Sequence, residues 1–198
     1  MSTNQAVDTA RPAAAVPVAA SATAARYEID PAHSRAEFAV KHMMVATVRG
    51  HMHGVTGTVV LDDANPARSS VEATVDASTV DTGVEMRDNH LRGTDFFDVA
   101  THPTISFRST SVRRTGEETF EVVGNLTIRG ATHAVTLEVE SAAVEAKDPY
   151  GAVKRGAVAT VTINRKEFGL NWNQGLEAGG VLVSDKVKVT IDLELTRK

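Results

Sequence analysis

Residues 187–195 read V-K-V-T-I-D-L-E-L, and this segment decides the class of fold. Every second residue is Val, Ile or Leu, and each residue between them is Lys, Thr, Asp or Glu. Successive side chains of a β-strand point to opposite sides of the sheet. The alternation therefore predicts a strand with one buried and one solvated face.

The same alternation recurs along most of the chain from Tyr27 onward. Further strands are expected at residues 34–41, 54–62, 70–77, 104–112, 119–129, 135–139 and 154–165. Gly, Pro, Asn and Asp mark the turns between them, and Arg129-Gly130 predicts a tight hairpin turn in which glycine supplies a positive φ. One short helix is expected at residues 84–91, with Asp81 or Thr82 as its cap.

Strands with hairpin connections and one polar face each predict an all-β, antiparallel fold. Roughly eight strands in one small domain usually close on themselves, because closure removes the exposed edges. An eight-stranded up-and-down β-barrel with one short helix is the first expectation, and a β-sandwich is the second.

Composition excludes several classes of protein. The 198 residues are 42 % hydrophobic and 23 % charged, as in soluble globular domains, and no apolar run is long enough for a membrane-spanning helix. The absence of cysteine removes disulfides, thiolate metal sites and a cysteine nucleophile. A formal net charge of −4 and only 5 % aromatic residues argue against nucleic acid as a partner.

The first 25 residues differ from the rest of the chain. Residues 11–25 are almost all Ala, Pro, Val, Ser and Thr, which bury too little surface to offset their chain entropy. Residues 1–25 are therefore expected to form a disordered tail, and residues 26–198 the folded domain. An export signal is the alternative, but the tail lacks a basic start and a hydrophobic centre. A cytoplasmic location is expected, with a periplasmic or secreted one if the tail is an atypical signal.

Small residues interrupt the apolar stripes of the expected strands. Gly57, Ala73, Gly124, Ala157 and Ala159 stand where Val, Ile, Leu or Phe stand elsewhere, and Ala77 does the same. Barrels of about eight strands are either filled by side chains or hold one small ligand. The small residues therefore indicate either an internal apolar cavity or the taper of a solid core, and the pattern alone leaves both open.

The densest polar cluster is R-D-N-H-L-R at residues 87–92. Arg87 and His90 would share one face of the short helix, where they could bind an anion or move a proton. Arg92 is a second candidate for a phosphate contact. Asp88 is favoured instead as a residue that satisfies backbone groups where the helix meets a strand.

Other motifs for catalysis or metal binding are weak. His51 and His53 would lie on one strand face with His42 near in sequence, but no recognised metal spacing is completed, and no metal is expected. No nucleophile elbow, phosphate loop or dinucleotide fingerprint occurs in the sequence. An all-β chain without these motifs favours binding over catalysis.

Several motifs together resemble the YceI-like, or polyisoprenoid-binding, family, and they span residues 27–196 in the family's order. The motifs are Y-E-I-D-P-A-H-S at 27–34, F-A-V-K-H at 38–42, R-D-N-H-L at 87–91, D-F-F-D at 95–98, H-P-T-I-S-F at 102–107, G-N-L-T-I-R-G at 124–130 and R-K-E-F-G-L at 165–170. The resemblance implies an extended, lipocalin-like barrel whose interior holds the chain of a long isoprenoid or related amphiphile, without catalysis.

The expected function is non-enzymatic binding, transport or storage of such a lipid, with an isoprenoid or quinone-like ligand and no other cofactor. The alternatives are an enzyme that uses His90 or Arg87 on a lipid-like substrate, and a structural, stress-related homodimer with a filled barrel. The residues expected to contact the ligand chain are selected because they fall on the inward side of an alternating strand and within the motifs shared with the family. They are Phe38, Val40, Ile105, Phe107, Leu126, Ile128 and Phe168. Arg87, His90, Asn171 and Trp172 are the candidates for the mouth of the cavity.

Overall fold

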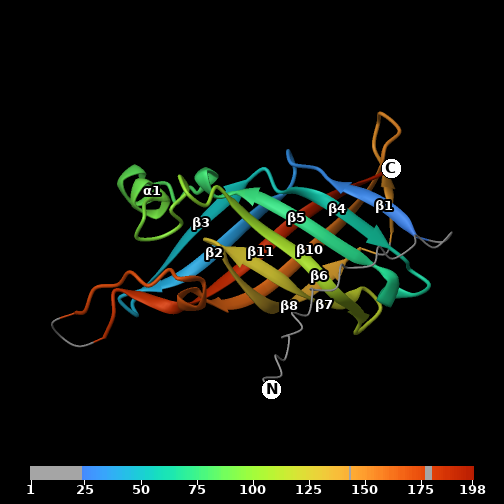
Figure 1. Cartoon of the computed structure of the whole chain (residues 1–198). Coiled ribbons are helices and arrows are strands. Elements are labelled where there is room, and N and C mark those ends of the chain that lie inside the picture. Colours follow the sequence, from blue (N-terminus) through green and yellow to red (C-terminus); the bar gives the residue numbers. More distant parts are fainter. Residues whose placement is uncertain (1–23, 143, 177–179) are drawn as a thin grey trace, which may run out of the picture.

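The computed structural model describes residues 24–142, 144–176 and 180–198, and its strands form one antiparallel sheet (Figure 1). The strands are β1 (Ala25–Ile29), β2 (Arg35–His42), β3 (Ala46–His53), β4 (Thr56–Leu61), β5 (Ser70–Asp76), β6 (Thr104–Arg114), β7 (Thr119–Ile128), β8 (Ala131–Ser141), β9 (Ala146–Lys147), β10 (Val153–Asn164) and β11 (Val183–Arg197). The α-helix among the described residues is α1 (Glu85–Arg92), and 3-10 turns form at η1 (Pro66–Arg68), η2 (Ala77–Thr79) and η3 (Arg165–Phe168).

The sheet closes into a barrel through the pairing of β10 with β11. Their ladder runs without interruption from Lys154 opposite Thr196 to Asn164 opposite Lys186. The closed ring contains eight strands in the order β1, β4, β5, β6, β7, β8, β10 and β11. A barrel is therefore observed, and the alternative of two packed sheets is wrong.

Two positions in the ring are each occupied by two strands, one following the other along the barrel wall: β1 with β2, and β4 with β3. This lengthens the barrel on one side. β1 and β2 both pair with β11, β1 near its C-terminal end and β2 along its N-terminal part. β3 and β4 follow in the same way, because β3 pairs with β2 and β4 pairs with β1. The chain also ends beside its first strand, where the Lys198 amide donates to the Arg26 carbonyl at 2.9 Å.

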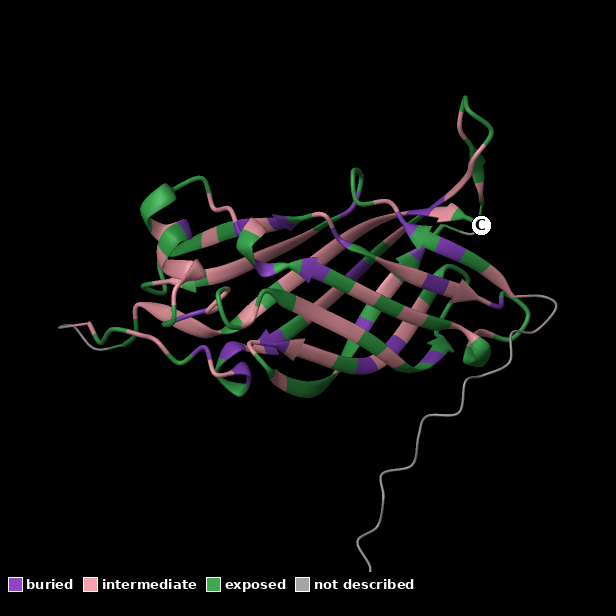
Figure 2. Ribbon diagram, turned by 45° about the horizontal axis from the view of Figure 1, so that its top comes forward, coloured by how far each residue is buried: buried purple, intermediate pink, exposed green. Residues whose placement is uncertain are grey.

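Alternating burial along the strands follows the alternating sequence (Figure 2). On β10 the buried positions are Arg155, Ala159 and Ile163, whereas Val158 between them is 37 % exposed. The segment 187–195, which the sequence marks as half-buried, lies entirely within β11. Figure 1 shows α1 and the β2–β3 connection at one end of the barrel and the chain terminus at the other.

The structure corrects some of the expected elements. β3 is a strand that the expected ranges lack, although His51 and His53 are expected on one strand face. Gly50 interrupts its inward stripe of Val48 and Met52. The helix is present but is capped at Val84, without a side-chain bond, and not at Asp81 or Thr82. The predicted turn at Arg129-Gly130 is confirmed, with φ of 49° and 74°.

The expected tail lies outside the described residues, apart from Ala24 and Ala25, and Ala25 already belongs to β1. Among the described residues, no helix combines the length and the hydrophobicity needed to cross a bilayer.

Gly57 on β4 is the position of the barrel that tolerates a side chain least. Its φ is +148°, and a Cβ there would stand 2.0 Å from the Glu72 carbonyl oxygen of the neighbouring strand. We expect Gly57→Ala to lower the free energy of unfolding by about 2 kcal/mol or more, measured by urea denaturation.

The matched control is Gly156→Ala on the outer face of β10, where no atom lies within 4 Å of the added Cβ. This variant should match the wild type or be slightly more stable, because alanine restricts the unfolded chain. Equal stability of the two variants would contradict the close approach of β4 to β5.

Candidate functional site

The barrel encloses a cavity of about 610 Å³, within the size range of small-molecule binding sites. Its wall is made by the inward-facing residues of the ring, which are mostly Val, Leu, Ile, Phe and Ala. The sequence pattern left a cavity and a solid core open, and the structure has the cavity.

Small residues contribute to this space in two different ways. Ala73, Ala157 and Ala159 line the cavity directly, as an empty volume requires. Gly124 does not, because a Cβ there would stand 2.4 Å from Cζ of Phe107, whose ring lies over the glycine. Gly50 is covered in the same way by the ring of Phe38, also at 2.4 Å. These two glycines make room for phenylalanine rings, so Gly124 fits the alternative in which a small residue accommodates its neighbour and leaves no empty volume.

Most of the residues expected to contact a ligand chain line this cavity. They are Phe38, Val40, Ile105, Phe107, Leu126 and Ile128. Phe168 does not line it, which corrects its expected placement. The 3-10 turn η3 ends the strand parity before this residue, and its 1 % exposed side chain instead packs with its ring centroid 5.1 Å from that of His133.

Aromatic rings gather at the α1 end of the cavity. His90 on α1 lies edge-on to Trp172, with ring centroids 4.8 Å apart, and Phe96 completes the group at 5.1 Å from His90. His90 Nε2 also lies 2.9 Å from a carboxylate oxygen of Asp95. Arg87, His90 and Trp172 line the cavity, as expected for its mouth, whereas Asn171 is exposed and does not line it.

Arg87 and Asp88 hold the chain that leads into α1. The buried Asp88 carboxylate accepts from the Thr82 amide at 2.9 Å and from the Thr82 hydroxyl. Arg87 donates to the same hydroxyl at 2.7 Å and to the Thr82 carbonyl at 3.1 Å. The structural role favoured for Asp88 is therefore observed, and Arg87 combines that role with a place in the cavity wall.

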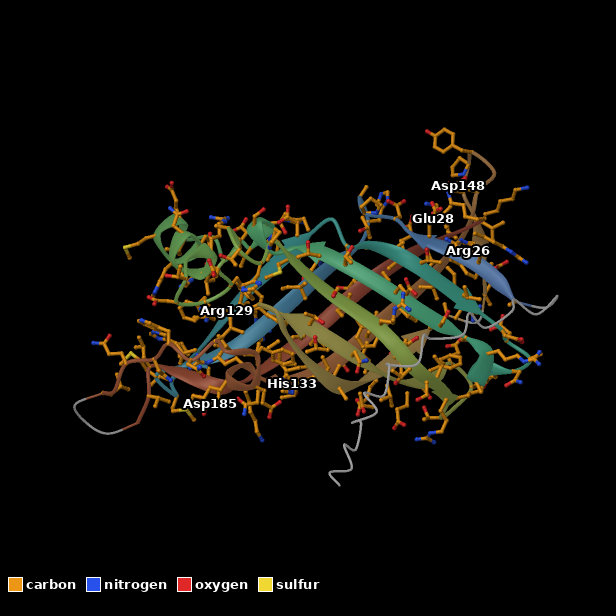
Figure 3. All side chains as sticks on the ribbon, in the orientation of Figure 1. Arg26, Glu28, Arg129, His133, Asp148 and Asp185 are labelled. Atoms are coloured by element: carbon orange, nitrogen blue, oxygen red, sulfur yellow. The ribbon has the colours of Figure 1, made fainter. Side chains whose placement is uncertain are left out.

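Arg92 anchors the other side of the helix. Its guanidinium donates to the Ser78 carbonyl at 2.8 Å and to the Val80 carbonyl at 2.7 Å. Arg129 makes a similar clamp from the end of β7 to the carbonyls of Gly169 and Thr94, both at 2.7 Å, and Figure 3 shows it at the α1 end of the barrel. The loops that frame the mouth are thus held by arginine bonds to their carbonyls.

A buried arginine stands at each end of the inward stripe of β10. Arg165, just after the strand, is 4 % exposed and donates to the carbonyls of Ser184 and Trp172 at 3.0 and 2.8 Å, and also to that of Leu170. Burial lowers its pKa, and these carbonyls and nearby Asp185 compensate for the lost water. Arg165 fastens the mouth segment to the start of β11, near Asp185 in Figure 3.

Arg155 closes the opposite end of the cavity. It is 5 % exposed, donates to the Ala142 carbonyl at 2.8 Å and forms a two-nitrogen contact with Asp63 at 3.2–3.3 Å. Burial lowers the pKa of Arg155, but Asp63 and Tyr27 together, through hydrogen bonds and charge, outweigh it and raise the pKa overall. Beside it the Tyr27 hydroxyl donates to Glu145, and burial together with this bond raises the pKa of Tyr27.

The sequence analysis did not identify the polar residues at the Arg155 end of the cavity, Arg155 and Ser141, although the sequence contains a signal for both. Arg155 has the parity of Ala157 and Ala159, so it faces inward on β10. Ser141 likewise has the parity of Leu137 and Val139 on β8. A polar residue in phase with an apolar stripe at the end of a strand would have indicated both.

One group of possible metal ligands comes together among the described residues, and it consists of Asp30, His33 and Glu194. The Lys154 ammonium already stands 2.9 Å from Asp30 and 2.8 Å from Glu194, where a cation would bind. Its hydrogen bond lowers the pKa of Asp30, while Glu194 and Asp30 raise that of Lys154. The predicted pair His51 and His53 has ring centroids 4.5 Å apart but forms no such group with described residues.

Comparison with known proteins assigns this architecture to a family. The model of the YceI-like domain matches residues 27–195. The UPF0312 protein SA2479 of Staphylococcus aureus is 36 % identical over 170 residues, which cover 86 % of this chain and 96 % of that protein. The chain belongs to the YceI-like family. The resemblance inferred from the motifs is thereby confirmed.

Solved structures show the same fold. Burkholderia cenocepacia BcnA aligns with a TM-score of 0.71 and 26 % identity, over 84 % of this chain and 98 % of BcnA. A polyisoprenoid-binding domain from Saccharophagus degradans aligns with a TM-score of 0.62 over 87 % of this chain and 98 % of that domain. At 15 % identity the second likeness concerns the fold alone.

The contacts of Arg92 predict its effect on stability. Arg92→Ala removes three charged hydrogen bonds, two to carbonyls and one to the Asn89 side chain. It leaves the carbonyl of Val80, a residue with 0 % exposure, without this donor. We expect a loss of about 1–3 kcal/mol in the free energy of unfolding, measured by thermal or urea denaturation.

The control is Arg108→Ala, which removes a surface ion pair with Glu72 in which both side chains are more than half exposed. Such pairs contribute about 0–1 kcal/mol, so its stability should stay close to that of the wild type. If Arg92→Ala is as stable as Arg108→Ala, the guanidinium does not anchor α1.

Proposed function

We propose that the barrel binds, without chemical conversion, a long-chain isoprenoid or a similar amphiphilic lipid, with the chain in the cavity. The observation that carries this proposal is the cavity itself, about 610 Å³ with a wall made mostly of apolar side chains. Such a wall offers contacts to methylene and methyl groups and few partners to polar ones. Family membership and the printed name of the Saccharophagus degradans domain support the same class of ligand.

Burial of the chain provides the affinity. Each methylene removed from water contributes ~0.8 kcal/mol, so a chain of a few isoprene units offsets the entropy lost on binding and leaves affinity to spare. The wall is largely preformed, since Phe38 and Phe107 are seated on glycines of neighbouring strands. A preformed wall keeps the cost of ordering side chains low.

Entry is proposed at the α1 end. There Met86 lines the cavity and is 82 % exposed, and His90 and Trp172 frame the same opening. At the other end Arg155 and Tyr27 are almost fully buried. Carriage of quinones, which combine an isoprenoid chain with an oxygenated ring, fits the same proposal.

Native mass spectrometry of the full chain purified from its source organism tests the proposal directly. A bound species of several hundred daltons that is released only on denaturation, and extracted into organic solvent, is the expected result. A clean apo mass, together with no uptake of added geranylgeraniol, would contradict it.

A substitution within the cavity tests where the ligand binds. Ala159 lines the cavity on β10, so Ala159→Phe places a ring in the space proposed for the chain while keeping the interior apolar. We expect the affinity for geranylgeraniol to fall at least tenfold. Trp172, the single tryptophan of the chain, lines the cavity and reports binding by its fluorescence.

The matched control is Val158→Phe, one residue away on the outer face of the same strand. Its affinity should equal that of the wild type. Unchanged binding by a folded Ala159→Phe protein would place the ligand outside the barrel.

A further inference from the structure

The closed end of the cavity contains a polar group that the fold itself does not use. Ser141 is the last residue of β8 and is 7 % exposed, and its side chain lines the cavity. Its backbone amide donates to the Glu118 carbonyl at 2.9 Å. Within the described part of the chain, however, its hydroxyl oxygen has no hydrogen-bond partner. A buried hydroxyl without a partner is costly and calls for an explanation.

The neighbours of Ser141 make the contrast clear. Ser69 lines the same cavity, but its hydroxyl accepts the Asp62 amide at 3.0 Å. At the mouth, Arg165 is bonded to four carbonyls. The polar groups that serve only the fold thus form hydrogen bonds within the protein, whereas the Ser141 hydroxyl on the cavity wall is available to hydrogen-bond a ligand.

The charged residues near Ser141 limit which ligand groups its hydroxyl can bind. Ser141 on β8 pairs with Ala157 on β10, and Arg155 lies two residues along β10 from Ala157. The charge of Arg155 is neutralised by Asp63, with 3.2 Å between the guanidinium nitrogen and the carboxylate oxygen. Glu145 receives the Tyr27 hydrogen bond and pairs with Arg197 at 3.1 Å. A phosphate or carboxylate here would face cations that are already paired, close to several carboxylates. An uncharged oxygen needs no such counter-charge.

We infer that the closed end of the cavity is a subsite for an uncharged oxygen atom of the ligand, a carbonyl or hydroxyl, hydrogen-bonded to Ser141. This inference rests on the proposed function, because it places one polar atom at the inner end of an otherwise apolar chain. The ligand class becomes a long apolar chain with a neutral oxygen at the end that enters first. Any charged group would remain at the α1 end.

A matched pair of probes tests the subsite. 2-Pentadecanone and pentadecane have the same chain length and differ by one carbonyl oxygen. Binding of each to the full chain is followed by Trp172 fluorescence. The ketone should bind the wild type about 3- to 10-fold more tightly than the alkane, as one net hydrogen bond provides, and Ser141→Ala should remove this preference while alkane binding is retained.

Two further variants and a spectroscopic measurement fix the location of the effect. Ser141→Thr keeps the hydroxyl and should keep the preference. Thr160→Ala removes a hydroxyl from β10 that does not line the cavity and should leave the preference unchanged. The infrared carbonyl stretch of the bound ketone should lie at the hydrogen-bonded frequency in the wild type. In Ser141→Ala it should move to the frequency found in an apolar solvent.

The outcomes separate the two proposals. If both probes bind and their ratio is the same in wild type and Ser141→Ala, the subsite is overturned and lipid binding stands. If neither probe binds, the proposed function is overturned, and the subsite with it.

Discussion

The uninterrupted pairing of β10 with β11 is the interaction on which the rest of the structure depends. It joins two consecutive strands, and because β11 also pairs with β1, it converts a sheet with two free edges into a ring. Once the ring is closed, every inward side chain faces a common interior. The chemistry of that interior then follows from strand parity: an apolar stripe on β10 with Arg155 at one end and Arg165 just beyond the other.

Much of this arrangement could be predicted because parity is a local property. The segment 187–195 and the stripes on β6 and β7 indicate which side chains share a face, and Phe107 and Leu126 do line one cavity. The sequence could not predict the features that depend on contacts between residues distant in the chain. Phe107 from the neighbouring strand covers Gly124, and Phe168, which follows the end of β10 in η3, packs in the core without lining the cavity.

The polar groups divide according to whether the fold itself satisfies them. Asp88 and Arg92 bond to backbone groups around α1, and Lys154 bridges two carboxylates at the opposite corner. These contacts depend on loops whose positions no short sequence motif specifies, which is why the cluster at residues 87–92 had several possible roles before its partners were known. The cavity wall, in contrast, is mostly apolar, so the Ser141 hydroxyl, which is buried there without a hydrogen-bond partner among the described residues, stands out.

The meeting of the chain's end with its first strand has a consequence for how the barrel can be rearranged. Lys198 bonds to Arg26, and β11 runs beside β1, so the two ends of the folded ring are adjacent. In a closed ring of strands, no strand has to be the first in the chain. Linking residue 198 to residue 24 and opening the β6–β7 hairpin would therefore yield a circular permutant with the same set of strand pairs. In the permutant β11 and β1 would become consecutive strands, so the pairing that now joins the two ends of the chain would become a local one.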